Sequence, residues 1–236
     1  MSLSVITFFT GNNGGRIDNV KLLTSRMHHG TRFVCKVDKK LDHEESHTVQ
    51  CKQYLNRQSG TKCNGNKGFC GLKFNEVTFA GAHNAGTGML SQLMADCYVT
   101  NHDLNVTELL DFGIRFFDFD NKYYEENDDM WTGHGPKNIF FTTARFEEVL
   151  QDVQQWMTEH PDEVVIVYIG EMIANNRGLG IDKLARLFDK YFSGPQVKLN
   201  DHWRVHGDWP TLQQAIDSNE RLFAFGKFIK SLKTVM

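Results

Sequence analysis

The side chains best suited to chemistry in this sequence stand mostly where apolar runs end. They are two histidines, three carboxylates and one amide: His83, Asn84, Asp118, Asp120, His134 and Glu171. One histidine can take a proton from a nucleophile while the other gives a proton to a leaving group. The carboxylates and the amide are hard oxygen donors, the ligand type that calcium prefers. A hard cation beside two histidines suits attack at phosphorus, because it offsets charge that builds on the phosphoryl oxygens.

An alternation of strands and helices is predicted to position these side chains. Strands are expected where β-branched and aromatic residues gather, at Glu76–Ala82, Ile114–Asp120, Val164–Ile169 and Arg221–Phe225. Helices are expected from i, i+3, i+4 apolar spacing, at about 144–160, 181–191 and 211–219. This alternation with short links indicates an α/β fold with a parallel sheet. In a parallel barrel the carboxyl ends of the strands meet at one mouth, where the candidate residues would converge.

Side-chain alternation assigns faces within the predicted strands. Asp118 and Asp120 share one face, where two carboxylates repel each other unless a positive group lies between them. Arg115 points to the opposite face, which favours a structural role. Glu171 continues the face of Val165, Val167 and Ile169.

The segments between the strands carry further expectations. Thr107 is predicted to cap a short helix that ends at Asp111, and 121–131 is predicted to be an acidic loop. Gly133-His-Gly135 stands where a fourth strand could end. The histidines other than His83 and His134 are expected at the surface.

Cysteine usage favours disulfides. The chain has five cysteines, and those between 35 and 70 lie in a polar stretch rich in Gly and Asn. Such density is typical of secreted or extracellular-facing proteins. The predicted pairs are Cys63–Cys70 and Cys35–Cys51, which leaves Cys97 over. Free thiols are the alternative, and zinc is less favoured because no close Cys-x-x-Cys pair occurs.

Bulk composition narrows the class of protein. The chain has 236 residues, 40% hydrophobic and 23% charged, with a net charge of −3. These values are ordinary for a globular domain and give no basic field for nucleic acid. No transmembrane segment is expected, because no apolar run approaches about 20 residues, and the first residues lack a signal-peptide pattern. We expect an N-terminal extension and Cys-rich connector at 1–75 and an α/β domain at 76–236.

Several motifs in order resemble the X domain of phosphatidylinositol-specific phospholipase C and the wider PLC-like phosphodiesterases. The matching motifs are Gly81-Ala-His-Asn84, Gly113-Ile-Arg-Phe-Phe-Asp-Phe-Asp120, Gly133-His-Gly135 and Pro161-Asp-Glu-Val-Val-Ile-Val167. The resemblance is close over 76–171 and looser over 172–228. It implies a TIM-type (β/α) barrel. Such a barrel usually takes about 250 residues, so the chain after Glu76 is predicted to lack its C-terminal part.

The resemblance also implies roles. His83 would be the general base on the inositol 2-hydroxyl of a membrane phospholipid, and His134 the general acid on the diacylglycerol oxygen. The product would be a cyclic inositol phosphate. Asp120 stands where the metal-free bacterial type has an arginine, so the resemblance is to the calcium-dependent type. Calcium would then be held by Asn84, Asp118, Asp120 and Glu171, although Gly170 falls at the family's slot for the last of these.

Two other functions stay open at this point. The missing barrel strands would suit a catalytically impaired relative that binds lipid or a partner protein. The same scaffold could also act as a phosphodiesterase on another headgroup. The paired histidines and the oxygen donors favour the enzyme.

Overall fold

The computed structural model describes residues 62–89, 100–135, 140–201 and 207–226, together with the strands β1 (Ser4–Phe8), β2 (Val20–Thr24), β3 (Phe33–Lys36) and β4 (Gln50–Gln53). The other strands are β5 (Gly81–Ala82), β6 (Phe116–Tyr124), β7 (Asp129–His134), β8 (Phe141–Arg145), β9 (Val165–Ile173) and β10 (Leu222–Gly226). The α-helices are α2 (Val106–Asp111), α3 (Phe146–Glu159), α4 (Arg177–Phe192) and α6 (Leu212–Asp217). Short 3-10 helices are η1 (Lys67–Phe69), η2 (Phe74–Glu76), η3 (Ala85–Met89) and η4 (Glu125–Asn127).

The main sheet is mixed, and its described strands do not close into a barrel. Its order is β10-β9-β6-β5-β1-β2, with β7 paired to β6 and β8 paired to β7. The strands β5, β6, β9 and β10 are parallel to their neighbours within that set, whereas β1, β7 and β8 join antiparallel. The α/β class is therefore confirmed. A TIM-type barrel is not shown, and the described sheet is open, as expected of an incomplete barrel, but mixed where a parallel sheet was expected. Leu199 adds an isolated parallel bridge to Leu222, so the edge of β10 is partly covered.

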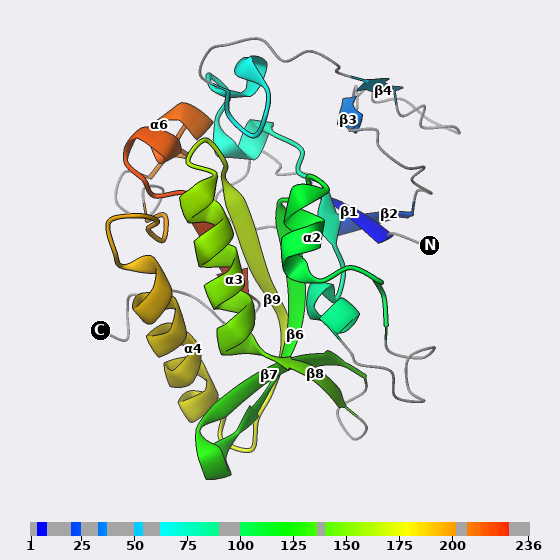
Figure 1. Ribbon diagram of the computed structural model, residues 1–236, viewed down its shortest axis with the longest axis vertical. Helices are drawn as coiled ribbons and strands as arrows, with labels where there is room; N and C mark the ends of the chain where they lie inside the picture. Colours follow the sequence, from blue (N-terminus) through cyan, green and yellow to red (C-terminus); the bar gives the residue numbers. More distant parts are fainter. Residues whose placement is uncertain are drawn as a thin grey trace.

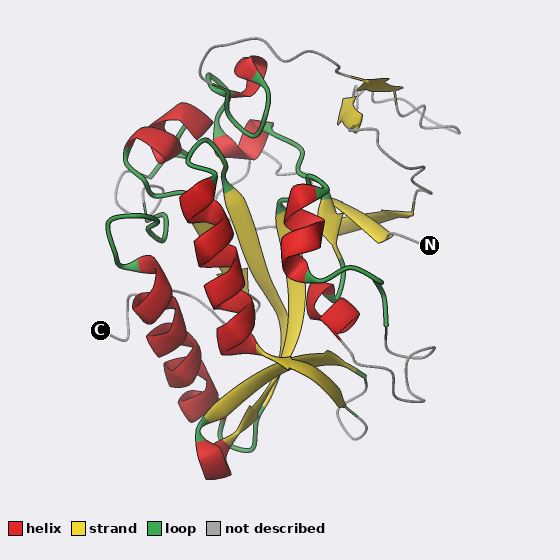
Figure 2. Ribbon diagram, viewed as in Figure 1, coloured by secondary structure: helices red, strands yellow, loops and turns green. Residues whose placement is uncertain are grey.

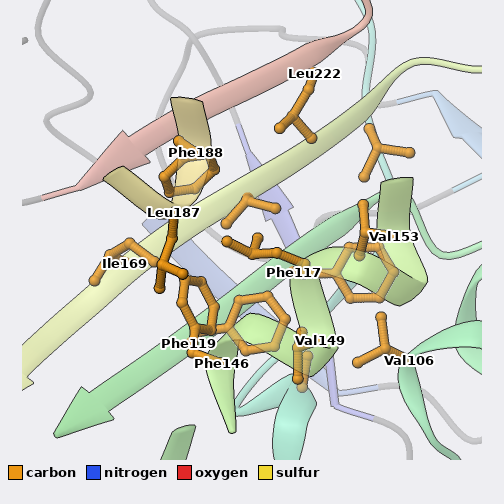
Figure 3. Packing of buried hydrophobic residues seen from close by; sticks show 14 of the residues in the cluster. Val106, Phe117, Phe119, Phe146, Val149, Val153, Ile169, Leu187, Phe188 and Leu222 are labelled. Carbon is orange, nitrogen blue, oxygen red and sulfur yellow. The ribbon is translucent and has the colours of Figure 1, made fainter. Parts of the chain in front are cut away.

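Helices cover one face of the sheet. Figures 1 and 2 show α3 lying along β9, with α4 on one side of α3 and α2 on the other side, near β6. The core under these helices is built from alternate strand residues such as Phe117, Phe119 and Ile169, which meet Phe146 and Phe188 (Figure 3). Burying each such aromatic side chain contributes about 1.5–3 kcal/mol.

A second apolar cluster lies on the opposite face of the same strands. It takes the intervening residues Phe116, Ile166 and Phe223 and packs them against Phe74 and Leu212. Asp118 follows Phe116 on this second face. The alternation of β6 thus places its acidic side chains on the face that α2, α3 and α4 leave uncovered.

The segment 121–131, predicted to be a loop, is mostly strand. β6 continues to Tyr124, turns through η4, and returns as β7. The prediction was wrong because it counted acidic residues and overlooked that Tyr123 and Met130 are buried, pair in register, and serve as core positions. The predicted helices near 144–160 and 211–219 are confirmed as α3 and α6, and α4 begins earlier than expected.

The described end of the cysteine-bearing connector contacts the start of β9. Cys63 and Cys70 form a disulfide, as predicted. Asn64 binds the start of β9, where its side chain both donates to and accepts from the main chain of Val164 at 2.9 Å. In the separate β3–β4 pair, Cys35 lies opposite Cys51 in the register, and their disulfide stays a prediction. Cys97 lies outside the described residues.

Candidate active site

Two strands bring the histidines to the same edge of β6 from opposite directions. β5 pairs with only the first two residues of β6 and ends at Ala82, directly before His83. The edge beyond that point is free for β7, which runs back along β6 until Gly133 lies opposite Asp120. His134 ends β7 there. The ring centres of His83 and His134 are 6.3 Å apart, so the fold brings the two histidines close together.

His83 is paired with a carboxylate of β6. Its Nδ1 lies 2.8 Å from Asp118 Oδ2, and a carboxylate can only accept, so Nδ1 carries the proton. This hydrogen bond raises the pKa of His83 above its ordinary value of 6.5, while burial opposes the rise and the charges of Asp118 and Asp120 support it. The remaining ring nitrogen, Nε2, is left as an acceptor.

Asn84 joins the two rings. Its Nδ2 lies 2.8 Å from His134 Nδ1 and 3.2 Å from His83 Nε2. Because the amide nitrogen donates, His134 Nδ1 must accept, and the proton of the neutral His134 ring then sits on Nε2. Asp120 Oδ2 is 3.8 Å from His134 Nδ1, which is too long for a hydrogen bond. The two rings are therefore poised differently: His83 offers a lone pair and His134 offers a proton.

The acidic pair lies against the backbone of β9. A β-bulge interrupts the register there, because Phe119 pairs with Ile169 but Asp120 pairs with Glu171, which leaves Gly170 as the extra residue. A Cβ on Gly170 would lie 2.7 Å from Asp118 Oδ1 and 3.0 Å from Asp120 Oδ1. The absence of a side chain at Gly170 is thus what lets both carboxylates meet at this strand.

The same bulge decides where Glu171 lies. Simple alternation put Glu171 on the face of Ile169, which packs under the helices. The extra residue instead sets Glu171 level with Asp120, and Glu171 is exposed. Burial raises the pKa of Asp120, and the charges of Asp118 and Glu171 raise it further. The expectation about its face was therefore wrong, while its proximity to the acidic pair agrees with the prediction.

Two oxygens of the site are buried without a hydrogen-bond partner among the described residues. They are Asn84 Oδ1 and Asp118 Oδ1. Asp118 Oδ1 and Asp120 Oδ1 both lie next to Gly170. Unpartnered oxygens of this kind, together with the raised pKa of Asp120, match what a hard cation would satisfy. Within the described part of the chain, however, no group of three or more His, Cys, Asp or Glu side chains is arranged to hold a metal ion.

Arg115 is structural, as predicted. It is buried, its Nε donates to Glu163 Oε2 at 2.8 Å, and its Nη1 donates to the main-chain oxygens of Leu110 and Ile114.

The predicted N-cap of α2 was the wrong residue. Asn105, and not Thr107, accepts from the main-chain nitrogen of Glu108.

His102 is a site residue that sequence reasoning missed. It was expected at the surface, but it is only 4% exposed, and its Nε2 lies 2.6 Å from the main-chain oxygen of His83. No apolar periodicity surrounds it, and the contact joins residues far enough apart that only the tertiary fold reveals it.

Comparison with known proteins supports the resemblance seen in the motifs. The PI-PLC X 1 family matches residues 69–235. A PI-PLC X domain-containing protein 1 of Arthroderma benhamiae is 32% identical over 169 residues, covering 69% of this chain and 50% of that protein. A PI-PLC X domain-containing protein of Arabidopsis thaliana is 28% identical, covering 66% of this chain and 36% of that protein. The chain thus spans about half the length, or less, of these curated relatives.

The phosphatidylinositol-specific phospholipase C of Staphylococcus aureus aligns with a TM-score of 0.46 and 17% identity, covering 62% of this chain and 46% of that protein. The enzyme of the same name from Listeria monocytogenes aligns with a TM-score of 0.43 and 20% identity, covering 62% and 49%. The match to the family profile covers well over half of the chain, and it includes both histidines and the acidic pair. The chain belongs to the PI-PLC X domain family.

Proposed function

We propose that this protein is a phosphoric diester hydrolase or lyase that cleaves phosphatidylinositol-type lipids by acid–base catalysis with two histidines. The observation that carries the proposal is the bridge of Asn84 between His83 and His134, which leaves a lone pair on His83 Nε2 and a proton on His134 Nε2. A cleavage that needs one proton removed and one delivered requires this arrangement.

His83 would begin the reaction. Its Nε2 lone pair takes the proton of the inositol 2-hydroxyl, and that oxygen then forms a bond to phosphorus. Nδ1 stays hydrogen-bonded to Asp118, whose negative charge stabilises the imidazolium that results. Once Nε2 is protonated it can no longer accept from Asn84. This contact, at 3.2 Å, is the longer of the two that Asn84 makes.

His134 would complete the reaction. The bond from phosphorus to the diacylglycerol oxygen breaks, and His134 Nε2–H gives that oxygen its proton. The Asn84 amide holds His134 Nδ1 meanwhile, which keeps the ring in the tautomer that can donate. The products are diacylglycerol and a cyclic inositol phosphate, which water can open in the reverse sense.

We further propose that calcium binds beside the histidines, held by Asn84 Oδ1, Asp118, Asp120 and Glu171, with water or substrate oxygens for the remaining positions. When bound, the ion would lower the pKa of the attacking hydroxyl and offset charge on the phosphoryl oxygens. Support comes from the unpartnered Asn84 and Asp118 oxygens and from the raised pKa of Asp120. Glu171 is the least supported of the four proposed ligands, because only the bulge in β9 sets it level with Asp120.

The substrate would be met at a membrane surface. None of the helices in the described ranges is both long enough and apolar enough to cross a bilayer. We propose that contact with lipid is peripheral, with the edge of β6 that lies beside His83 and His134 turned toward the headgroups.

The test is a product assay on vesicles of phosphatidylinositol with calcium, followed by ³¹P NMR. The proposal expects a cyclic phosphodiester resonance that is absent with His83→Ala and with His134→Ala. Parallel vesicles of phosphatidylglycerol and soluble glycerophosphoinositol ask whether another headgroup or a deacylated diester is preferred. Vesicle binding with no turnover of any of these substrates would instead identify a catalytically impaired lipid-binding relative.

A further inference from the structure

His102 lies directly behind the turn that carries His83 and Asn84. A carbonyl oxygen only accepts hydrogen bonds, so the contact of 2.6 Å between His102 Nε2 and the main-chain oxygen of His83 requires a proton on Nε2. This hydrogen bond holds the peptide that joins His83 to Asn84.

The following carbonyl is held as well. Thr87 Oγ1 donates to the main-chain oxygen of Asn84 at 2.8 Å and accepts from the main-chain nitrogen of Asn101 at 2.9 Å. Asn84 has a φ of 51°, in the left-handed region that asparagine adopts more readily than most residues other than glycine. The two carbonyls that flank the Asn84 α-carbon are thus both fixed, and the segment 100–104 takes part in fixing each.

Gly88 permits this close approach. A Cβ at Gly88 would lie 2.0 Å from the main-chain oxygen of Leu104 and 2.9 Å from the main-chain oxygen of His102. The turn 83–88 and the segment 100–104 therefore touch through their backbones, and the buried His102 ring completes the contact.

We propose that His102 is a positioning residue for catalysis. By holding the His83 carbonyl, His102 fixes the direction of the Asn84 side chain, whose Nδ2 contacts the rings of both His83 and His134. The proposal rests on the assignment of these two histidines as base and acid, but the contact itself can be measured without turnover.

Only Nε2 of His102 makes the hydrogen bond to the His83 carbonyl. Nδ1 is buried and has no hydrogen-bond partner among the described residues. Burial lowers the pKa of His102, which keeps the ring neutral. A glutamine amide nitrogen extends about as far from the backbone as Nε2 of histidine, whereas an asparagine amide nitrogen extends only as far as Nδ1. His102→Gln and His102→Asn are therefore a matched pair that differs in reach and not in polarity.

The experiment compares these two variants with the wild-type chain on phosphatidylinositol vesicles. His102→Asn is expected to lower kcat about 10- to 100-fold with little change in KM, as is usual when a group that orients a catalytic side chain is lost. His102→Gln is expected to keep kcat close to that of the wild type. Equal kcat values for all three proteins, or an equal loss in both variants together with equal losses of thermal stability, would overturn the proposal.

A second measurement separates failure of this inference from failure of the proposed function. The ¹³C shift of the His83 carbonyl and the ¹⁵N shift of the Asn84 amide report the hydrogen bond in metal-free buffer. Both shifts should move in His102→Asn and stay near the wild-type positions in His102→Gln. If the wild-type chain turns over no substrate, this pattern still supports the positioning contact, while unmoved shifts in His102→Asn overturn it.

Discussion

The two carboxylate oxygens of Asp118 have different surroundings at the centre of the site. Oδ2 accepts from His83, whereas Oδ1 is buried, has no hydrogen-bond partner in the described ranges, and lies with Asp120 Oδ1 close to Gly170. A single carboxylate thus connects the proposed base to the proposed cation position. Changes at Asp118 should affect both, and they can be separated by working without metal.

The first prediction concerns the titration of His83 in metal-free buffer. Wild-type His83 should titrate above 6.5, because the hydrogen bond to Asp118 stabilises the imidazolium. Asp118→Asn should lower the pKa of His83, as followed by NMR of the ring protons. Since the folded pKa is raised, the pair stabilises the fold below about pH 6.5, and this stabilisation is lost as the pH rises through the folded pKa.

The control for this titration is Asp128→Asn. Asp128 contacts Tyr123, Lys183 and Arg186 and has no contact with His83. It also has a φ of 51°, which asparagine tolerates. This variant should leave the His83 titration unchanged. A His83 pKa that is the same in wild type and in Asp118→Asn would show that the carboxylate does not set it.

Individual site residues were largely accessible from the sequence, since His83, Asp118 and Asp120 stand in motifs at predicted strand ends. His102 was not accessible, because its role depends on a main-chain oxygen of a distant residue and leaves no pattern in the chain. The tautomers of His83 and His134 were equally hidden, since the Asn84 contacts that set them exist only after folding.

At the scale of elements, the bulge in β9 controls the acidic pair. Gly170→Ala would place a methyl group 2.7 Å from Asp118 Oδ1 and 3.0 Å from Asp120 Oδ1, so the carboxylates must move. We expect this variant to reduce turnover about 100-fold, because misplacement of catalytic groups by about 1 Å costs that much. Calcium binding, measured by calorimetry, should weaken in parallel.

Gly194→Ala serves as the matched control, because a Cβ at Gly194 meets nothing within 4 Å. Its turnover and its calcium response should equal those of the wild type. If Gly170→Ala behaved like Gly194→Ala, the two carboxylates would not depend on the glycine of the bulge.

The disulfide loop is a second element with a measurable effect. Cys63 and Cys70 are separated by 7 residues, and closing so short a loop stabilises the folded chain by about 2–3 kcal/mol. The Cys63→Ala/Cys70→Ala double variant should lose about this much unfolding free energy in urea. Reduced wild type tests the covalent bond alone. An unchanged urea midpoint after reduction would contradict the predicted contribution.

Sequence reasoning found the elements with strong periodicity and missed those set by pairing. The apolar spacing of α3 was clear, since Val149, Leu150 and Val153 mark one face. The β6–β7 hairpin was missed, because its charged residues hid an alternation that continues to Tyr124. The bulge was missed because a strand pattern carries no sign of an extra residue, although the glycine at 170 was available as a hint.

For the molecule as a whole, the described sheet is an open mixed sheet and not a closed barrel. The parallel set β5, β6, β9 and β10 delivers Asp118, Asp120 and Glu171, while the antiparallel β7 delivers His134. The site is therefore assembled within the described residues, even though the chain spans only about half of its curated relatives or less. This arrangement brings the proposed catalytic residues together in a sheet that does not close within the described residues.

The most direct test of this account is the rate of phosphatidylinositol cleavage in calcium and in excess chelator, with His83→Ala as the background. We predict turnover in calcium that falls about 10²–10³-fold in chelator, the usual effect of removing a group that stabilises the transition state. Calcium added back should restore the rate, and His83→Ala should stay inactive throughout. Turnover that is unchanged in chelator would contradict the cation assignment, and turnover that survives in His83→Ala would contradict the central claim that the two histidines carry the reaction.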